Sequence, residues 1–258
     1  MRRPLPGSRS ACRVLAGLLV CGAVLEAVAQ PATFTIGEPG CLVLNPNPRR
    51  HERIQWSGGC KSGYADGTGV LLWYRDEALA QRYEGAMAGG QPEGIGTMSY
   101  SGGAARYEGG FHLGKRHGAG VLTYSNGMRL AASFDNGEPV GTVQVSGPQY
   151  TYEGGWLEGK PHGEGRAIYA DGRYEGQFSH GLREGRGSAS FANGNRYQGE
   201  WKANQPDGQG RMDFSDGSHY EGGWRAGRFH GEGVLTNSDG EATAGRWDHG
   251  KPVREPAS

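Results

Sequence analysis

Three histidines recur at equivalent places in a repeated motif and are the first residues to consider for chemistry. His117, His162 and His230 each stand directly before a Gly-x-Gly sequence. A row of imidazoles could hold a metal ion or relay protons. Other copies of the motif carry Glu184 and Asp207 at this position, so the row is broken where a relay needs continuity. We therefore expect the histidines to cap backbone groups at turns, and we predict no catalytic site, no metal site and no cofactor.

Glutamates at the second position of the motif offer another possible chemistry. They are Glu84, Glu108, Glu153, Glu175 and Glu221. Two facing carboxylates could act as acid and base on a glycosidic bond, but Arg and Lys elsewhere in the motif favour cross-strand ion pairs on a solvent face. The sequence has no nucleophile elbow, Walker-type loop or dinucleotide fingerprint. A glycan-acting enzyme of the cell envelope is therefore the least favoured function.

The elements that carry these residues repeat with a nearly constant period. Copies begin at Tyr83, Tyr107, Leu130, Tyr152, Tyr174, Tyr197, Tyr220 and Thr243, and the spacings are 24, 23, 22, 22, 23, 23 and 23 residues. An atypical first copy begins at Trp56, and the copy at 130–151 is degenerate. The array therefore covers residues 56–250 with about eight to nine copies, and such an array folds through contacts between neighbouring copies.

The copy that begins at Tyr152 shows what each unit should look like. Side chains alternate along a strand, so Tyr152, Gly154 and Trp156 share one face. A helix is excluded, because each interior glycine would cost about 1 kcal/mol relative to alanine. Glycine also weakens a strand, so its regular placement needs a reason. We expect a large ring to lie flat over the bare glycine backbone of the neighbouring strand.

Two kinds of turn should join the strands. Dipeptides of Asn or Asp with Gly suit tight type I′ hairpin turns; they are Asn126-Gly127, Asp171-Gly172, Asn193-Gly194, Asp216-Gly217 and Asp239-Gly240. The other turn runs through Gly114, Gly159, Gly181 and Gly227, and we expect it to be longer and more variable. Each copy is then a β-hairpin, and stacked hairpins form an all-β fold: one elongated, single-layer antiparallel sheet.

The motif Tyr-Glu-Gly-x-Trp-x-x-Gly-x-x-His-Gly-x-Gly resembles the MORN repeat (membrane occupation and recognition nexus). Residues 152–165 and 220–233 match it fully, and three further copies match it with one to three replacements. The resemblance covers roughly residues 56–250. It implies a single-layer β-strip with a shallow groove. It also implies roles in scaffolding, protein docking or membrane association, sometimes beside an enzyme.

Composition agrees with a thin array. Glycine accounts for 49 of 258 residues, yet no Gly-X-Y period is present, which excludes collagen. The hydrophobic content of 35% is low for a globular core. It is sufficient for an array in which each copy buries only a few aromatic rings.

Residues 1–29 are predicted to be a cleaved signal peptide. They combine four arginines, an apolar run too short to span a membrane, and a small-residue site before Gln30. An uncleaved N-terminal anchor is the alternative. We expect an exported protein, periplasmic or secreted and of bacterial-envelope type, cleaved near Ala29. Without these residues the chain has 23 basic and 26 acidic residues, a net charge of −3. That balance excludes nucleic acid as a partner and weakens attraction to anionic lipid.

Two cysteines remain in the exported chain, and we predict a Cys41–Cys60 disulfide. Closing a loop of this size is worth about 3 kcal/mol in the chain-entropy model. Residues 30–55 lack the repeat pattern, so we expect them to form an N-terminal cap that the bridge fastens to the first copy. Two free thiols are the alternative. Residues 251–258 are predicted to be a disordered tail.

An aromatic stripe is the remaining candidate site. Its members are Tyr83, Tyr107, Phe111, Tyr152, Trp156, Tyr174, Phe178, Tyr197, Trp201, Tyr220 and Trp224. They should pack first, but a one-layer sheet cannot hide both faces, so we expect part of the stripe to line an accessible groove. The leading hypothesis is a non-catalytic scaffold that binds a protein or another envelope macromolecule there.

Phospholipid head groups are the alternative ligand. Five basic residues are expected near the longer turns: Lys115, Arg116, Lys160, Arg183 and Arg228. If they face the solvent together, they could attract an anionic lipid surface at low ionic strength.

Overall fold

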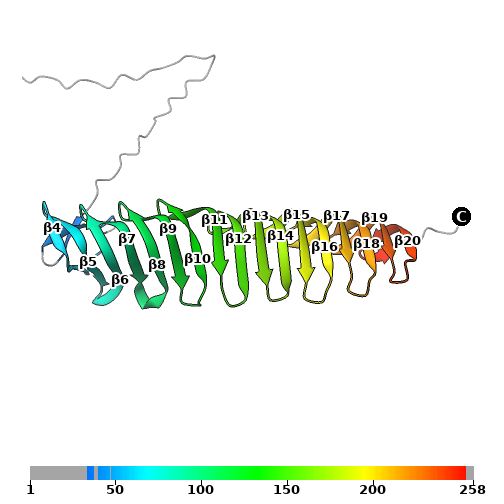
Figure 1. The fold of residues 1–258 in the computed structure, drawn as a ribbon, viewed down its shortest axis with the longest axis horizontal. Coiled ribbons are helices and arrows are strands. Elements are labelled where there is room, and N and C mark those ends of the chain that lie inside the picture. Colours follow the sequence, from blue (N-terminus) through cyan, green and yellow to red (C-terminus); the bar gives the residue numbers. More distant parts are fainter. Residues whose placement is uncertain (1–33, 38–39, 47, 254–258) are drawn as a thin grey trace, which may run out of the picture. The chain divides into compact units, whose positions relative to one another are not determined.

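The computed structural model describes residues 34–37, 40–46 and 48–253, and the predicted signal peptide lies outside the described residues. Within them the regular structure is β-strand, apart from one short 3-10 helix, η1 (Ser101–Gly103). The strands lie side by side along one line (Figure 1). Because each strand contacts mainly its sequence neighbours, the all-β, single-sheet expectation is confirmed.

Each repeat supplies two antiparallel strands. The strands that begin the copies are β6 (Ala78–Ala88), β8 (Ala105–His112), β10 (Arg129–Asp135), β12 (Tyr150–Leu157), β14 (Gly172–Ser179), β16 (Arg196–Lys202), β18 (His219–Arg225) and β20 (Ala242–Asp248). They alternate with β5 (Tyr64–Arg75), β7 (Gln91–Tyr100), β9 (Lys115–Tyr124), β11 (Glu138–Ser146), β13 (Lys160–Tyr169), β15 (Leu182–Phe191), β17 (Gln205–Asp213) and β19 (Arg228–Thr236). From β5 to β20 every strand pairs with the next one along the chain.

Among the described residues, four short strands precede β5, in the N-terminal cap and at the start of the first copy. β1 (Phe34–Gly37) pairs with β2 (Cys41–Leu44), while β3 (Glu52–Trp56) and β4 (Gly59–Lys61) both pair with β5. The predicted disulfide between Cys41 and Cys60 is present, with the two Cα atoms 5.6 Å apart. It ties β2 to β4, so the leader is fastened to the first copy as expected.

The two kinds of turn are exchanged relative to the sequence prediction. The Gly159 turn is a tight two-residue loop, because Leu157 pairs with Lys160 and both Glu158 and Gly159 have positive φ, at 50° and 78°. That is the type I′ pattern, and the equivalent turns share it. Four of the five Asx-Gly turns are longer, whereas the turn at Asp171 is a two-residue loop in which Tyr169 pairs with Gly172. Positive φ occurs at Gly127 but not at Asn126, whose side-chain oxygen accepts the N–H of Met128.

The physical reason lies in the aspartate and asparagine side chains. An Asx side chain can hold the backbone two residues further on, which stabilises a type I turn followed by a left-handed glycine. In the same way, the side-chain oxygens of Asn193 and Asp216 accept the backbone N–H groups of Asn195 and Ser218. The type I′ turns begin with residues as different as Leu113, His180 and Ala226, and among those that the structure describes only the one at Asn136-Gly137 has an Asx-Gly sequence.

The C-terminal end of the array differs from the prediction in one detail. Lys251–Pro252 forms the short strand β21 and pairs with β20. The prediction of a disordered tail from Lys251 is therefore wrong for these two residues. Among the described residues, none forms a helix of the length and apolar character that crossing a bilayer requires.

Candidate binding surface

The buried core is a line of tyrosine rings lying over glycines. Tyr152 covers Gly154 on its own strand and Gly165 on the next. A methyl group added at Gly165 would come within 2.6 Å of the Tyr152 ring. Tyr83, Tyr107, Tyr174, Tyr197 and Tyr220 are arranged in the same way. The expectation that rings lie on bare glycine backbone is thus confirmed for six copies.

A break in the strand ladder follows each of these rings. Between Gly154 and Trp156 the pairing of β12 with β13 is irregular, and the Tyr152 hydroxyl donates a 2.6 Å hydrogen bond to the freed carbonyl of Gly155. The first glycine of each Gly-x-Gly lies in the same irregularity, and Gly163 has φ of 72°. The two glycines of the motif therefore serve different purposes: one allows positive φ and the other allows ring contact.

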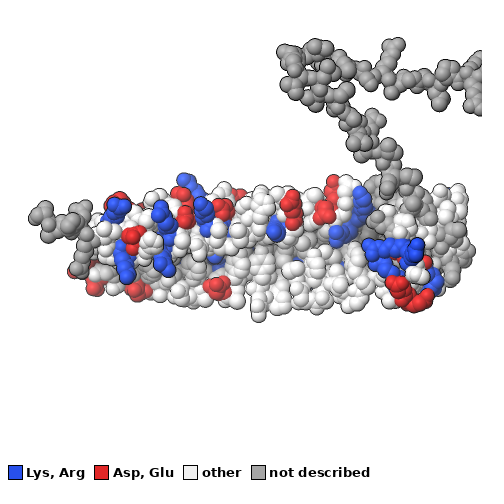
Figure 2. Space-filling model, turned by 180° about the vertical axis from the view of Figure 1, so that it is seen from behind, with Lys and Arg blue, Asp and Glu red and all other residues white. Residues whose placement is uncertain are grey.

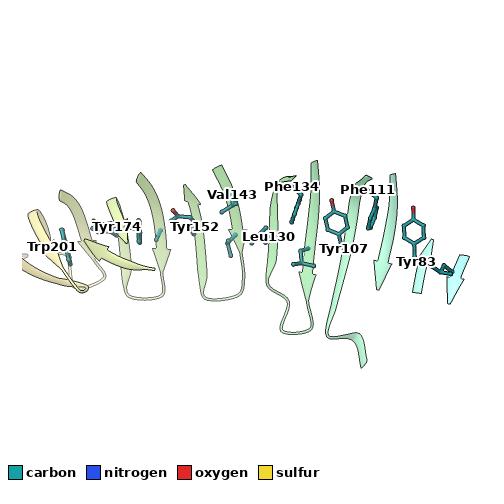
Figure 3. Close-up of a cluster of buried hydrophobic side chains, with 14 of the residues drawn as sticks. Tyr83, Tyr107, Phe111, Leu130, Phe134, Val143, Tyr152, Tyr174 and Trp201 are labelled. Atoms are coloured by element: carbon teal, nitrogen blue, oxygen red, sulfur yellow. The ribbon is translucent and has the colours of Figure 1, made fainter. Parts of the chain in front are cut away.

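Neighbouring copies are joined by edge-to-face ring contacts. Trp201 stands between Tyr174 and Tyr197, with centroids 5.2 and 5.1 Å away and planes at 84° and 89°. Phe111, Phe178 and Trp224 occupy the same place in their copies. Figure 3 shows this line of rings, and shows Leu130 and Val143 between Phe134 and Tyr152. The core is therefore a ladder that is interrupted once.

The stripe predicted to line a groove is buried instead. Ten of its eleven members are at most 6% exposed, and Trp156 is half-buried. Side chains from the second strand of a copy pack on these rings: Arg183 lies 4.5 Å from the ring of Trp201 in the following copy, and Phe229 stacks on Tyr220 of its own copy at 3.7 Å. Because these side chains and the adjacent rings complete the packing, a one-layer sheet does hide this stripe.

A second line of aromatic residues lies on the same face and is only half-buried. We call it the second ring row; its members are Trp73, Tyr100, Tyr124, Tyr169, Phe191 and Phe214. Tyr169 pairs with Tyr150 across the sheet, two residues from the Tyr152–Ala167 pair, which places it on the core face. Tyr169, Phe191 and Phe214 pack against the buried cluster. The row escaped the sequence interpretation, although each member except Trp73 follows its copy's tyrosine by 17 residues.

The opposite face carries charged residues of both signs. Arg106 pairs with Glu108 at 2.9 Å, and Arg211 contacts both Asp213 and Glu221, at 2.8 and 3.5 Å. In the view of Figure 2, basic and acidic side chains are interspersed over the visible surface. Exposed pairs of this kind are each worth less than about 1 kcal/mol. This face therefore has no single-sign field that would hold a polyanion.

The motif histidines lie along the edge of the type I′ turns. His117 Nδ1 is 3.4 Å from Asp135, and the His162 ring lies 5.4 Å from that of His180. Where a carboxylate replaces histidine, it caps the turn of the next copy: Glu184 accepts the N–H of Ala203 at 3.0 Å. Within the described residues, no group of three or more potential ligands is placed to hold a metal ion.

The basic residues considered for lipid binding do not act as one group. Arg116 donates to the Gly137 carbonyl at 2.6 Å, and Arg183 to the Asn204 carbonyl at 2.8 Å, so both are engaged in packing. Lys115, Lys160 and Arg228 are exposed but begin strands β9, β13 and β19. With strands about 4.8 Å apart, they are separated by roughly 19 and 29 Å, beyond the screening length of about 8 Å at physiological salt.

Fold and ring ladder together define a class of protein, the single-layer β-repeat array. The MORN repeat family model matches residues 83–105, 107–129, 152–172, 174–196, 197–219 and 220–242, more than half of the chain. The chain therefore belongs to the MORN-repeat family. The copies at 56 and 130 and the final copy lie outside these matches, yet they form strands of the same sheet. Members of this family are generally non-catalytic and often bind partners or membrane lipids.

Comparison with other proteins adds little beyond the family. No curated protein matches the chain in sequence. Among solved structures, it is similar to the SAS-4 (dCPAP) TCP domain of Drosophila melanogaster, in complex with a proline-rich motif of Ana2 (dSTIL). The identity is 13%, the coverage is 78% of this chain and 95% of that chain, and the TM-score is 0.27. At that score the likeness carries no argument about function.

Proposed function

We propose that this chain is a non-catalytic, exported scaffold that binds a partner protein along the second ring row. One observation carries the proposal: a line of half-buried aromatic side chains on the core face of a sheet that is one layer thick. Half-buried rings in a row are typical of interaction surfaces, because they offer large apolar area at low entropic cost. The Cys41–Cys60 disulfide supports an oxidising compartment outside the cytosol.

The dimensions of the row suit an extended segment of the partner. From Trp73 on β5 to Phe214, directly after β17, the row crosses twelve strand spacings, roughly 60 Å. An extended chain rises about 3.3 Å per residue, so roughly 18 residues would cover it. A partner segment of that length could contact all six rings without the array changing shape.

A site-specific photocrosslinker tests this surface. Placed at Phe191, on the second ring row, it should capture a discrete partner in the compartment where the protein resides. Placed at Glu175, on the opposite face, it should not. The pair of substitutions Tyr169→Ser and Phe191→Ser should abolish capture by a crosslinker placed at Phe214. The matched control Ile168→Ser removes an apolar side chain that is 47% exposed on the other face, and should leave capture intact. Equal capture from both faces would exclude the second ring row.

Anionic phospholipid remains the second ligand class to test, and the separation of Lys115, Lys160 and Arg228 disfavours it. Flotation with vesicles of neutral and of anionic lipid separates the two proposals. Binding that requires anionic lipid, is lost with these three residues and is indifferent to Phe191→Ser would favour the membrane over a protein partner.

A further inference from the structure

A distinct cavity lies at the N-terminal end of the second ring row, between the cap and the first copies. Its volume is about 400 Å³. Trp73 and Met98 line it from the core face of the sheet, Val43 from the cap, and Leu113 from the type I′ turn of the copy that begins at Tyr107. A volume of this size falls within the range of ligand sites, about 300–1,000 Å³.

The cap covers the N-terminal end of the second ring row and closes it. Leu44 donates to the carbonyl of Gly90 at 2.8 Å, on the edge of the type I′ turns. The chain then returns to the opposite edge, where Glu52 pairs with Arg75. The described residues between these two contacts therefore lie over the core face, where Asn45, Pro46 and Arg49 line the cavity. A chain that lies along the second ring row would have to end here.

Glu52 is the one acidic residue among the described residues that line the cavity, and its negative charge is balanced by Arg75. Its side chain is 4% exposed and accepts hydrogen bonds from the Arg49 N–H, from Asn45 and from Arg75. Burial alone would raise the pKa of Glu52, but these donors, together with Trp73, lower it below the ordinary value. The carboxylate therefore stays ionised and is paired with Arg75.

Two further cations at the cavity have no acidic partner among the described residues. Arg49 and Lys115 both line it, one from the cap and one from the start of β9, and both residues are exposed. With Arg75 balancing Glu52, the cavity has apolar walls and an excess of two positive charges. Its ligand should therefore combine an apolar body with a carboxylate.

We propose that this cavity binds the C-terminal residue of the partner protein, with an apolar last side chain against Trp73, Met98 and Leu113 and the terminal carboxylate between Arg49 and Lys115. The inference rests on the proposed function, because it takes the segment on the second ring row to end here. A free chain end supplies the required pair of groups at the point where the row is closed.

Short N-acetylated peptides that end in leucine test the cavity directly, by fluorescence anisotropy with the mature protein. The free acid should bind, and the same peptide with a C-terminal amide should bind about five-fold to ten-fold more weakly. Binding of the free acid should weaken as salt rises. Equal affinity of acid and amide would overturn the proposal, and so would no binding by either.

Three substitutions locate the binding. Leu113→Glu places a negative charge at the cavity, and the array should tolerate it because Glu158 occupies the same turn position with φ of 50°, against 49° for Leu113. It should abolish peptide binding. Lys115→Ala and Arg49→Ala should each weaken binding about three-fold to ten-fold, whereas the matched controls Lys160→Ala and Arg50→Ala should not.

The experiments distinguish failure of the cavity proposal from failure of the proposal that a partner binds the second ring row. If a partner is crosslinked at Phe191 but is indifferent to Leu113→Glu and to amidation of its own C-terminus, the cavity assignment is wrong and the second ring row stands. If the peptide binds but no partner contacts the row, the cavity stands alone. Binding of octanoate to the cavity with no binding of the free-acid peptide would assign it to a fatty acid instead.

Discussion

The copy that begins at Tyr174 and the degenerate copy that begins at Leu130 solve the same packing problem differently. In the first, a tyrosine ring lies over Gly176 and Gly187. In the second, the smaller Leu130 is 5% exposed, and Val143 occupies the place of the second glycine and is fully buried. The pairing irregularity also moves by one residue, to lie between Ala131 and Ser133. Volume is therefore conserved across the sheet although the ring is lost.

The loss of the ring and its glycines in the degenerate copy also removes a hydrogen bond from the copy that follows. Trp201 donates its indole N–H to the Gly187 carbonyl at 3.1 Å, and Trp224 and Trp247 do the same to Gly210 and Gly233. Trp156, which follows the degenerate copy, has no acceptor for its buried N–H and is tilted by 45° against Tyr152. The comparison shows that ring, glycine and tryptophan form one unit, which must change together.

The largest effect should come from placing only one residue of the degenerate copy into a complete copy. Tyr174→Leu leaves Gly176 and Gly187 uncovered and should destabilise by about 3–5 kcal/mol. Gly187→Val alone places a side chain against the Tyr174 ring and should cost about 1–3 kcal/mol or more. The double variant should be more stable than the sum predicts, by about 1–3 kcal/mol. Urea unfolding of all four proteins measures this, and simple additivity would contradict the comparison.

The reverse exchange should have a smaller effect. Leu130→Tyr forces a ring against Ala132 and Val143, and overpacking of this kind costs about 1–3 kcal/mol. Adding Ala132→Gly and Val143→Gly should recover much of that loss, because the ring then has a bare floor. A Leu130→Tyr variant as stable as the parent in thermal unfolding would show that the degenerate copy has unused space.

The indole hydrogen bond should give a third, smaller difference. Trp201→Phe loses the bond to Gly187, whereas Trp156→Phe removes a buried donor that has no partner. We expect Trp201→Phe to cost about 1 kcal/mol more than Trp156→Phe. Denaturant midpoints of the two variants, measured at equal slope, test the difference. An equal cost would mean that Trp156 finds an acceptor in solution.

The last prediction concerns stability at alkaline pH and requires no substitution. Burial raises the pKa of Tyr83 and of Tyr152 from 10.0 to about 12. The folded state therefore keeps these protons when the unfolded chain has lost them. This contribution to stability is complete below pH 10 and is lost as the pH rises from 10 towards 12. Tyrosinate absorbance should rise later in the native than in the denatured protein, while Leu130 contributes nothing to the signal.

Prediction from sequence succeeded where one residue type had one physical reason. The period, the strands and the rings over Gly154 and Gly165 followed from spacing and alternation, and the disulfide followed from the two cysteines that remain after the predicted signal peptide. Prediction failed where one sequence pattern fits two local structures. The Asx-Gly signal indicated type I′ turns, but side-chain capping by Asn126 makes a type I turn with a left-handed glycine. Alternation through Ala167 and Tyr169 was visible, yet the second ring row was not singled out.

The accessibility of the stripe could not be predicted from sequence. Whether Trp201 is buried depends on the Arg183 side chain above it and on Tyr174 from the preceding copy, contacts that exist only once the strands are in register. The cavity beside Met98 depends in the same way on a cap that crosses the core face. The cap lies outside the repeated motif, so the motif gives no signal for the cavity.

The amino-acid sequence by itself determined that this chain folds as stacked hairpins, because aromatic rings and glycines alternate at fixed intervals and so many glycines disfavour a helix. Only the tertiary structure decided which rings are exposed and where the row is closed. The physical reason is that exposure depends on side chains from other strands and from the cap, and these meet only in the assembled sheet.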